Sequence, residues 1–241
     1  MAGILDSPCR SKPNKANRNE GDYFMTETIH PMNITIFGAT GKIGQALLKE
    51  ALNREHDVTA VVRDVSRLQM EHERLHPVIG DLLDPDSVAE HCKGREAVIS
   101  AYGPQAGDEE EMLEAARSLV EGVRRSGTKR LLVVGGAGSL ITDDGVRLMD
   151  APTFPEELYF LAKAHADAYG IYSGSDLDWT YLSPAAVLEE GPRSGNFRIG
   201  IDRLITDEAG SSRITIADLA AALVDELEDP YFVRSRFTVA Y

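Results

Sequence analysis

The chain has little cysteine, no long apolar run and too few basic residues to balance its acidic ones. Its two cysteines, Cys9 and Cys92, stand far apart and form neither a C-x-x-C motif nor a metal-ligand spacing. We therefore expect two unpaired thiols in a reducing compartment, and no metal site. No segment is apolar over the length that spans a bilayer, and the N-terminus lacks the apolar core of a signal peptide. These absences predict a cytoplasmic protein that contacts no membrane.

The charge balance is acidic, with 39 Asp and Glu against 25 Lys and Arg and a formal net charge of −14. A nucleic-acid partner requires clustered Lys and Arg to neutralise its phosphates, and the sequence has no such cluster. We therefore expect a small-molecule ligand and no nucleic acid. The 241 residues suffice for one sizeable core. Whether the protein is a monomer or a homodimer stays open.

Two parts of unequal length are expected. Residues 1–31 are rich in Pro, Asn, Lys, Ser and Glu and show no apolar period, which predicts a disordered leader. Residues 32–241 are predicted to form one domain. Met1, Met25 and Met32 are alternative translation starts, because the first predicted strand follows Met32.

The most informative segment is the run 32–44, which is typical of a strand, a glycine turn and the start of a helix. Gly38 suits the positive φ of the turn, Gly41 lacks the Cβ that would keep phosphates away, and Gly44 allows the helix to pack on the strand. A second apolar strand is predicted at 58–62, which completes the unit. The amides and dipole of the helix N-terminus attract an anion. The segment therefore predicts a dinucleotide site.

The residues that follow the second strand indicate the cofactor. Sites that prefer NAD place an acidic residue here to bind the ribose 2′-OH, whereas this chain has Arg63, then Asp64, and Arg67 one turn later. A guanidinium offers a fork of donors for the 2′-phosphate of NADP. We expect NADP(H), with NAD(H) as the alternative if Asp64 turns towards the ribose.

Apolar strands alternate with amphipathic helices along the rest of the chain. Further strands are predicted at 75–79, 97–101, 130–134 and 178–182, and helices at 109–125, 155–172 and 216–227. This order is typical of a Rossmann-type α/β fold, a doubly wound parallel sheet whose ligands bind at the carboxyl ends of the strands. Beyond residue 185 the alternation stops. A small C-terminal lid region is predicted at about 185–214, with strand-like pieces at 197–199 and 204–206, and an edge strand at 236–241.

Five segments resemble the atypical and extended short-chain dehydrogenase/reductases, in particular the NADH-flavin reductase group near the NmrA-like and biliverdin-reductase-B-like proteins. They are residues 38–44, 61–64, 134–140, 179–185 and 236–241. The resemblance implies NAD(P) contacts along the strand ends. The pyrophosphate would lie on Thr40, Gly41, Lys42 and Ile43, the 2′-phosphate on Arg63, the adenine on Asp81 and Leu82, the nearer ribose on Ala101, Tyr102 and Gly103, and the nicotinamide between Gly135, Gly136 and Pro184.

Tyr159 and Lys163 match the Tyr-x-x-x-Lys pair of short-chain dehydrogenases. At this spacing both side chains share one helix face, so the lysine can hold the nicotinamide ribose and lower the pKa of the phenol. Ser139 could hydrogen-bond a substrate carbonyl. Alternatively, Tyr159 has no catalytic role and packs in the core. The flavin-reductase-like relatives do not rely on this tyrosine, and a flavin stabilises the transferred charge itself. His165 is expected on a solvated face.

These patterns predict an NADP(H)-dependent oxidoreductase that transfers hydride to a small acceptor, most simply a flavin or quinone-like ring lying on the nicotinamide. One alternative is a non-catalytic NADP-binding redox sensor of the NmrA-like type, which a partner protein reads. A nucleotide-sugar epimerase or dehydratase is the third alternative. It is disfavoured because the C-terminal part is short for a nucleotide-sugar subdomain.

Overall fold

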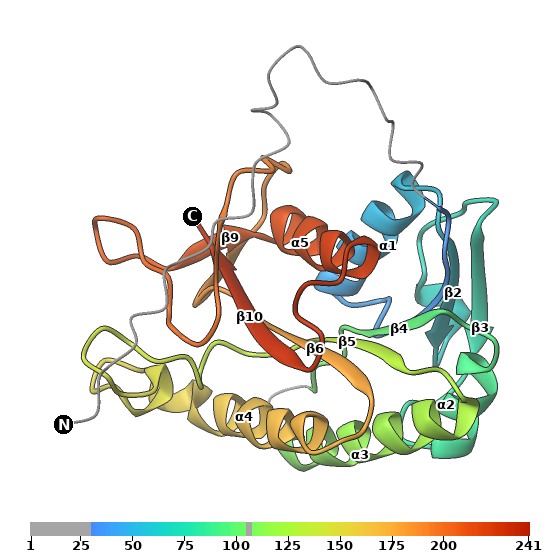
Figure 1. Ribbon diagram of the computed structural model, residues 1–241, viewed down its shortest axis with the longest axis horizontal. Coiled ribbons are helices and arrows are strands. Elements are labelled where there is room, and N and C mark those ends of the chain that lie inside the picture. The colour runs from blue at the N-terminus through green and yellow to red at the C-terminus, as the bar shows by residue number, and fades with distance from the viewer. Residues whose placement is uncertain (1–29, 105–107) are drawn as a thin grey trace.

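A mostly parallel sheet of eight strands forms the centre of the protein, in a computed structural model that describes residues 30–104 and 108–241. The strand order is β3-β2-β1-β4-β5-β6-β10-β8. Figure 1 shows helices α1 and α5 on one face of this sheet and α2, α3 and α4 on the other. This is the predicted doubly wound Rossmann-type fold. The predicted leader, residues 1–31, lies almost entirely outside the described residues.

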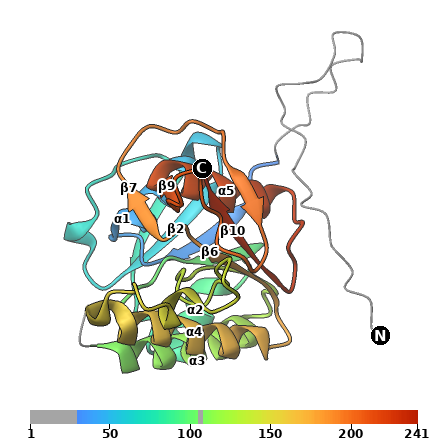
Figure 2. The same cartoon turned by 90° about the vertical axis from the view of Figure 1, so that its left-hand side faces the viewer.

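The element bounds follow the apolar segments closely. The strands of the main sheet are β1 (Asn33–Phe37), β2 (Asp57–Val62), β3 (Leu75–Ile79), β4 (Ala97–Ser100), β5 (Arg130–Val134), β6 (Asp178–Ser183), β8 (Arg198–Gly200) and β10 (Ser235–Ala240). The helices are α1 (Lys42–Asn53), α2 (Pro85–Cys92), α3 (Glu109–Ser126), α4 (Tyr159–Ser173) and α5 (Ile216–Glu228). A separate two-stranded parallel sheet joins β7 (Val187–Glu189) to β9 (Arg213–Thr215). Figure 2 shows this small sheet on the side of the main sheet that α1 and α5 cover.

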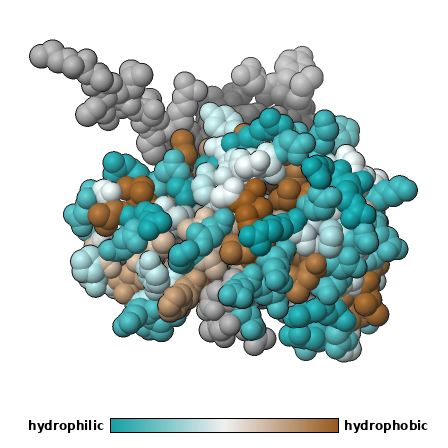
Figure 3. Space-filling model, turned by 90° about the horizontal axis from the view of Figure 1, so that it is seen from below, coloured by the Kyte–Doolittle hydropathy of each residue, from teal (hydrophilic) through white to brown (hydrophobic). Residues whose placement is uncertain are grey.

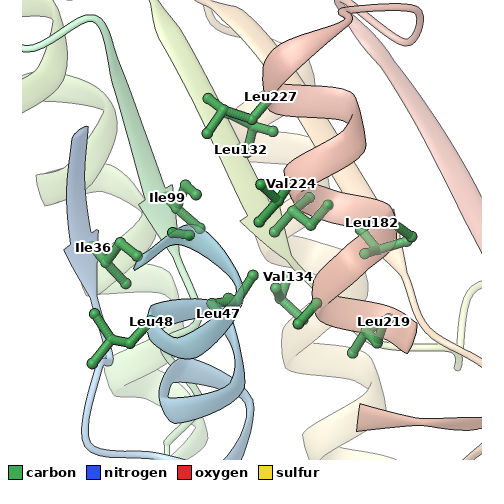
Figure 4. Close-up of a cluster of buried hydrophobic side chains, with 14 of the residues drawn as sticks. Ile36, Leu47, Leu48, Ile99, Leu132, Val134, Leu182, Leu219, Val224 and Leu227 are labelled. Atoms are coloured by element: carbon green, nitrogen blue, oxygen red, sulfur yellow. The ribbon is translucent and has the colours of Figure 1, made fainter. Parts of the chain in front are cut away.

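Two apolar clusters fix the helices to the two faces of the sheet. Figure 4 shows Leu47 and Leu48 of α1 and Leu219 of α5 directed at side chains of the central strands. On the opposite face Tyr181 of β6 is buried against α4. Alternate residues of each strand therefore serve the two layers, and the ligand-binding edge is left to the loops that follow the strands.

Two predictions about the elements are wrong, and one helix was missed. The C-terminal strand is not an edge strand, because β8 adds to β10 in the antiparallel direction and takes the edge position. Residues 204–206 form no strand; a single bridge joins Arg203 to Ile141. Helix α2 was not predicted, although Asp84 caps it by accepting from the Asp86 amide and Pro85 begins it. Asp followed by Pro is a local helix-start signal.

The outer surface of the α2, α3 and α4 layer is largely hydrophilic, with smaller apolar areas between the polar side chains (Figure 3). Among the residues that the structure describes, no helix has the length and apolar character needed to cross a membrane.

Candidate cofactor and acceptor site

The three glycines after β1 have different physical roles. Gly38 has φ of 76°, and a Cβ on it would lie 2.6 Å from the carbonyl carbon of Ala101. A Cβ on Gly44 would lie 2.1 Å from the Gly38 oxygen. Both positions therefore need glycine for the turn to close. A Cβ on Gly41 would meet only the Gly38 oxygen, at 3.4 Å, so the space in front of Gly41 is open to a ligand.

The N-terminus of α1 is prepared for an anion. Gly41 is its N-cap, no side chain caps the helix, and its first turn holds no acidic residue. The amides of that turn and the positive end of the helix dipole are thus available to a diphosphate. Lys42 forms an exposed ion pair with Glu190, with Nζ 3.2 Å from Oε1, which joins this turn to the loop after β7. These features fit the pyrophosphate of a dinucleotide.

At the end of β2, Arg63 and Asp64 differ in how much freedom they keep. Asp64 caps a short 3-10 turn by accepting from the amide of Ser66 at 2.9 Å and from its hydroxyl at 2.7 Å. These bonds hold the pKa of Asp64 below its usual value. Arg63 is exposed and takes part in no ion pair within the described ranges. The guanidinium is free for a ligand, whereas the carboxylate is committed to the turn.

The other predicted adenosine contacts lie at the same edge of the sheet, because β1 to β4 are neighbouring parallel strands. Asp81 is held after β3: its amide donates to the Ser87 hydroxyl at 3.0 Å and its carboxylate accepts from the Leu83 amide at 2.9 Å. Tyr102 follows β4 and its phenol donates to the carboxylate of Glu111. Burial and this carboxylate raise the pKa of Tyr102, while the nearby Arg63 opposes the rise. Arg63 and Tyr102 are therefore close together.

The predicted nicotinamide contacts lie at the ends of β5 and β6. The amide of Gly135 donates to the carbonyl of Leu182 at 2.9 Å, which brings Pro184 to the same edge. A Cβ on Gly135 would lie 2.0 Å from the ring of Tyr181, and a Cβ on Gly136 would lie 3.0 Å from the side chain of His165. Glycine is thus needed at position 135 for packing. At position 136, glycine has no side chain, so the side chain of His165 can pack directly beside the end of the strand.

The Tyr-x-x-x-Lys pair is not assembled as a proton relay. Lys163 forms an ion pair with Asp167, one turn further along α4, and half of its side chain is exposed. Tyr159 packs edge-on against Phe160, with ring centres 5.9 Å apart, and its phenol has no hydrogen-bond partner among the described residues. The charge of Arg147 lies close to Tyr159. Lys163 would have to leave Asp167 before it could hold a ribose.

Ser139 is tied to the C-terminal strand. Its hydroxyl oxygen accepts from Arg236 at 2.9 Å. The same guanidinium donates to Asp202 at 2.9 Å and lies 5.0 Å from the ring centre of Tyr169. Ser139 therefore helps to hold residues 201–203 of the predicted lid against β10, and its proton remains available to a ligand.

His165 is where the sequence reasoning was wrong. It does not lie on a solvated face; its half-buried side chain packs from α4 against Gly136, and burial lowers its pKa to about 4. Its Nδ1 atom has no hydrogen-bond partner in the described part of the chain. The helix surface that faces the sheet carries Ala162, His165 and Tyr169. Their i, i+3, i+7 spacing was visible in the sequence as a sheet-facing stripe.

Comparison with known proteins defines the class. A family model described as NAD(P)H-binding matches residues 38–230. The uncharacterized protein YwnB of Bacillus subtilis (strain 168) is 40% identical over 215 residues, covering 86% of this chain and 98% of YwnB. The chain belongs to this NAD(P)H-binding family, and its fold and motifs are those of the atypical short-chain dehydrogenase/reductases.

Two solved structures are also similar. A Bacteroides thetaiotaomicron protein, provisionally named an epimerase, is 41% identical with a TM-score of 0.83, covering 88% of this chain and 98% of that one. A Streptococcus pneumoniae protein, provisionally named an NADH-flavin reductase, is 35% identical with a TM-score of 0.77, covering 87% and 99%. The two names differ in the reaction they give, and the second names a nicotinamide cofactor.

Proposed function

We propose that the protein is an NADP(H)-dependent reductase that passes hydride to a flavin or quinone-like ring. The observation that carries the cofactor preference is the contrast at the end of β2, where Arg63 is free and Asp64 is bound to Ser66. A ribose 2′-phosphate suits a free guanidinium, and a 2′-OH would need the carboxylate that the turn already uses.

Each part of the strand-end edge has a distinct task in this function. Gly41 and the first turn of α1 would hold the diphosphate, and Arg63 the 2′-phosphate. Bound NADPH would supply a hydride, which is one proton together with two electrons. The second proton of the reduced ring would come from solvent. The acceptor ring would lie at the end of β5, where the side chain of His165 packs against Gly136.

The acceptor class is supported by the state of the Tyr159 and Lys163 pair. A ketone needs a positioned acid to protonate the developing alkoxide, but here Lys163 pairs with Asp167 instead of facing Tyr159. A flavin or quinone delocalises the added charge over its own ring, so it needs no such acid. The name of the S. pneumoniae relative agrees with a flavin.

The test is turnover of NADPH by the pure protein with riboflavin, FMN, menadione and benzaldehyde as acceptors, followed by the loss of absorbance of the reduced nicotinamide. We expect oxidation with the ring acceptors and none above background with benzaldehyde. Binding of NADPH without consumption by any acceptor would instead identify an NADP-binding sensor of the NmrA-like type. Turnover with benzaldehyde and with no ring acceptor would identify a carbonyl reductase instead.

A further inference from the structure

Beside the ends of β5, β6 and β10, three hydrogen-bonding atoms have no partner among the residues that the structure describes. They are Nδ1 of His165, Oγ of Ser183 and Oγ1 of Thr238, all buried, with Ser183 0% and Thr238 1% exposed. A buried polar atom without a partner costs about 1–3 kcal/mol, and folded proteins rarely leave one. Thr59, Arg95, Ser118 and Arg130 also carry such atoms, each on a different part of the chain, and those of His56 and Glu228 lie 3.2 Å from each other. Three together therefore need an explanation.

The three side chains lie on one level of the sheet and on one face. Ser183 and Thr238 are register partners in neighbouring strands. Ser183 is two residues after Tyr181, whose ring packs against Tyr169 of α4, so alternation places Ser183 on the α4 face. The Tyr181 phenol also donates to the His165 carbonyl at 2.9 Å. Gly135 and Gly136, which follow the last residue of β5, lie at the same level of the sheet.

The polar groups at this level are uncharged. The two hydroxyls are neutral, and with its pKa lowered to about 4 by burial, His165 is a neutral imidazole at physiological pH. The neighbouring cation, Arg236, is neutralised by Asp202 and bound to Ser139. No free positive charge is therefore presented there by the described residues. A carboxylate or phosphate would be disfavoured, whereas carbonyl and N–H groups would find both donors and acceptors.

We propose that His165, Ser183 and Thr238 form a subsite that hydrogen-bonds an uncharged ring carrying carbonyl or imide groups, the head of the hydride acceptor. The proposal rests on the proposed reductase function and adds to it the residues that recognise the acceptor. Because the His165 side chain fills the space in front of Gly136 and covers this level, the ring would enter as that side chain turns aside, and would then complete the three unpartnered atoms. The cofactor would occupy the adjoining strand ends.

The experiment measures two quantities separately: riboflavin binding by quenching of its fluorescence, and NADPH-dependent menadione reduction. His165→Ala and Thr238→Val should each weaken riboflavin binding and lower kcat/KM for menadione, by about fivefold to hundredfold for the histidine. The Kd for NADPH should stay within about twofold, since this subsite does not hold the cofactor. His165→Asn should recover much of the loss by returning a hydrogen-bonding group.

Thr59→Val is the matched control, because it removes an equally buried and unpartnered hydroxyl from β2, away from this level. It should change neither quantity. Equal riboflavin binding in the wild type, Thr238→Val and Ser183→Ala would overturn the subsite even if NADPH oxidation proceeds. A parallel loss of NADPH affinity would also overturn it, by assigning the three atoms to the nicotinamide amide. Riboflavin binding that depends on these residues without NADPH oxidation would keep the subsite and refute the reductase function.

Discussion

Replacing Arg63 with alanine tests the cofactor preference at its source. A charge-assisted hydrogen bond contributes about 1.5–3 kcal/mol, and 1.4 kcal/mol corresponds to a tenfold change in Kd. Arg63 is exposed, which reduces the gain through solvent screening. We therefore expect Arg63→Ala to weaken NADPH about tenfold to hundredfold and to leave NADH within about twofold. Titration of the nicotinamide fluorescence with both cofactors measures the two constants in one preparation.

The control for Arg63 is Arg67, another arginine one turn further along the chain. Its Coulomb interaction is with Asp64, which the 3-10 turn holds in place. Arg67→Ala should change both affinities by less than about threefold, because no hydrogen-bonding fork is lost. Equal weakening of NADPH and NADH by Arg63→Ala would refute the assignment of the 2′-phosphate. A selective loss of NADH in Asp64→Ala would show that the carboxylate leaves Ser66 to bind a ribose.

Four further substitutions test other parts of the site and the fold. Gly41→Val should abolish binding of both cofactors with an unchanged thermal melt, whereas Gly44→Val should destabilise the fold, because its Cβ meets the Gly38 oxygen. Tyr159→Phe should change turnover with menadione less than about tenfold, since loss of a general acid costs roughly 10²–10⁴-fold. Glu226→Ala should lower the unfolding free energy by about 3–5 kcal/mol, because it leaves a buried arginine cation unpaired. A domain of this size would melt roughly 6–20 °C lower, measured by circular dichroism.

The local geometry of the proposed cofactor site could be predicted from the sequence because its signals are local. The turn at Gly38 and the close contact at Gly44 depend on residues within a few positions of each other, so the motif itself encodes the geometry. Arg63 could be singled out because it stands directly after an apolar strand. The strand ends then meet because parallel strands share an edge.

The proposed acceptor site depends on contacts between distant segments, and the position of His165 could not be predicted from the sequence. The rotation of α4 about its axis decides whether Tyr159 or His165 faces β5, and packing on Gly136 and Tyr181 sets that rotation. The position of β10 depends on its pairing with β8, some 40 residues earlier in the chain. The ion pair of Lys163 with Asp167 was readable as an i, i+4 pair, but the Tyr-x-x-x-Lys motif suggested a different partner.

Transfer of deuterium from NADPH labelled at C4 tests the central claim most directly. The protein is mixed with menadione and, in separate single-turnover reactions, with cofactor labelled on one face or on the other. We expect oxidation to be slower with one of the two labelled cofactors, and deuterium to be lost from that cofactor alone. We also expect faster turnover with NADPH than with NADH. Bound but unoxidised NADPH, or oxidation that is equally fast with both labels and loses deuterium from both, would contradict hydride transfer in this site.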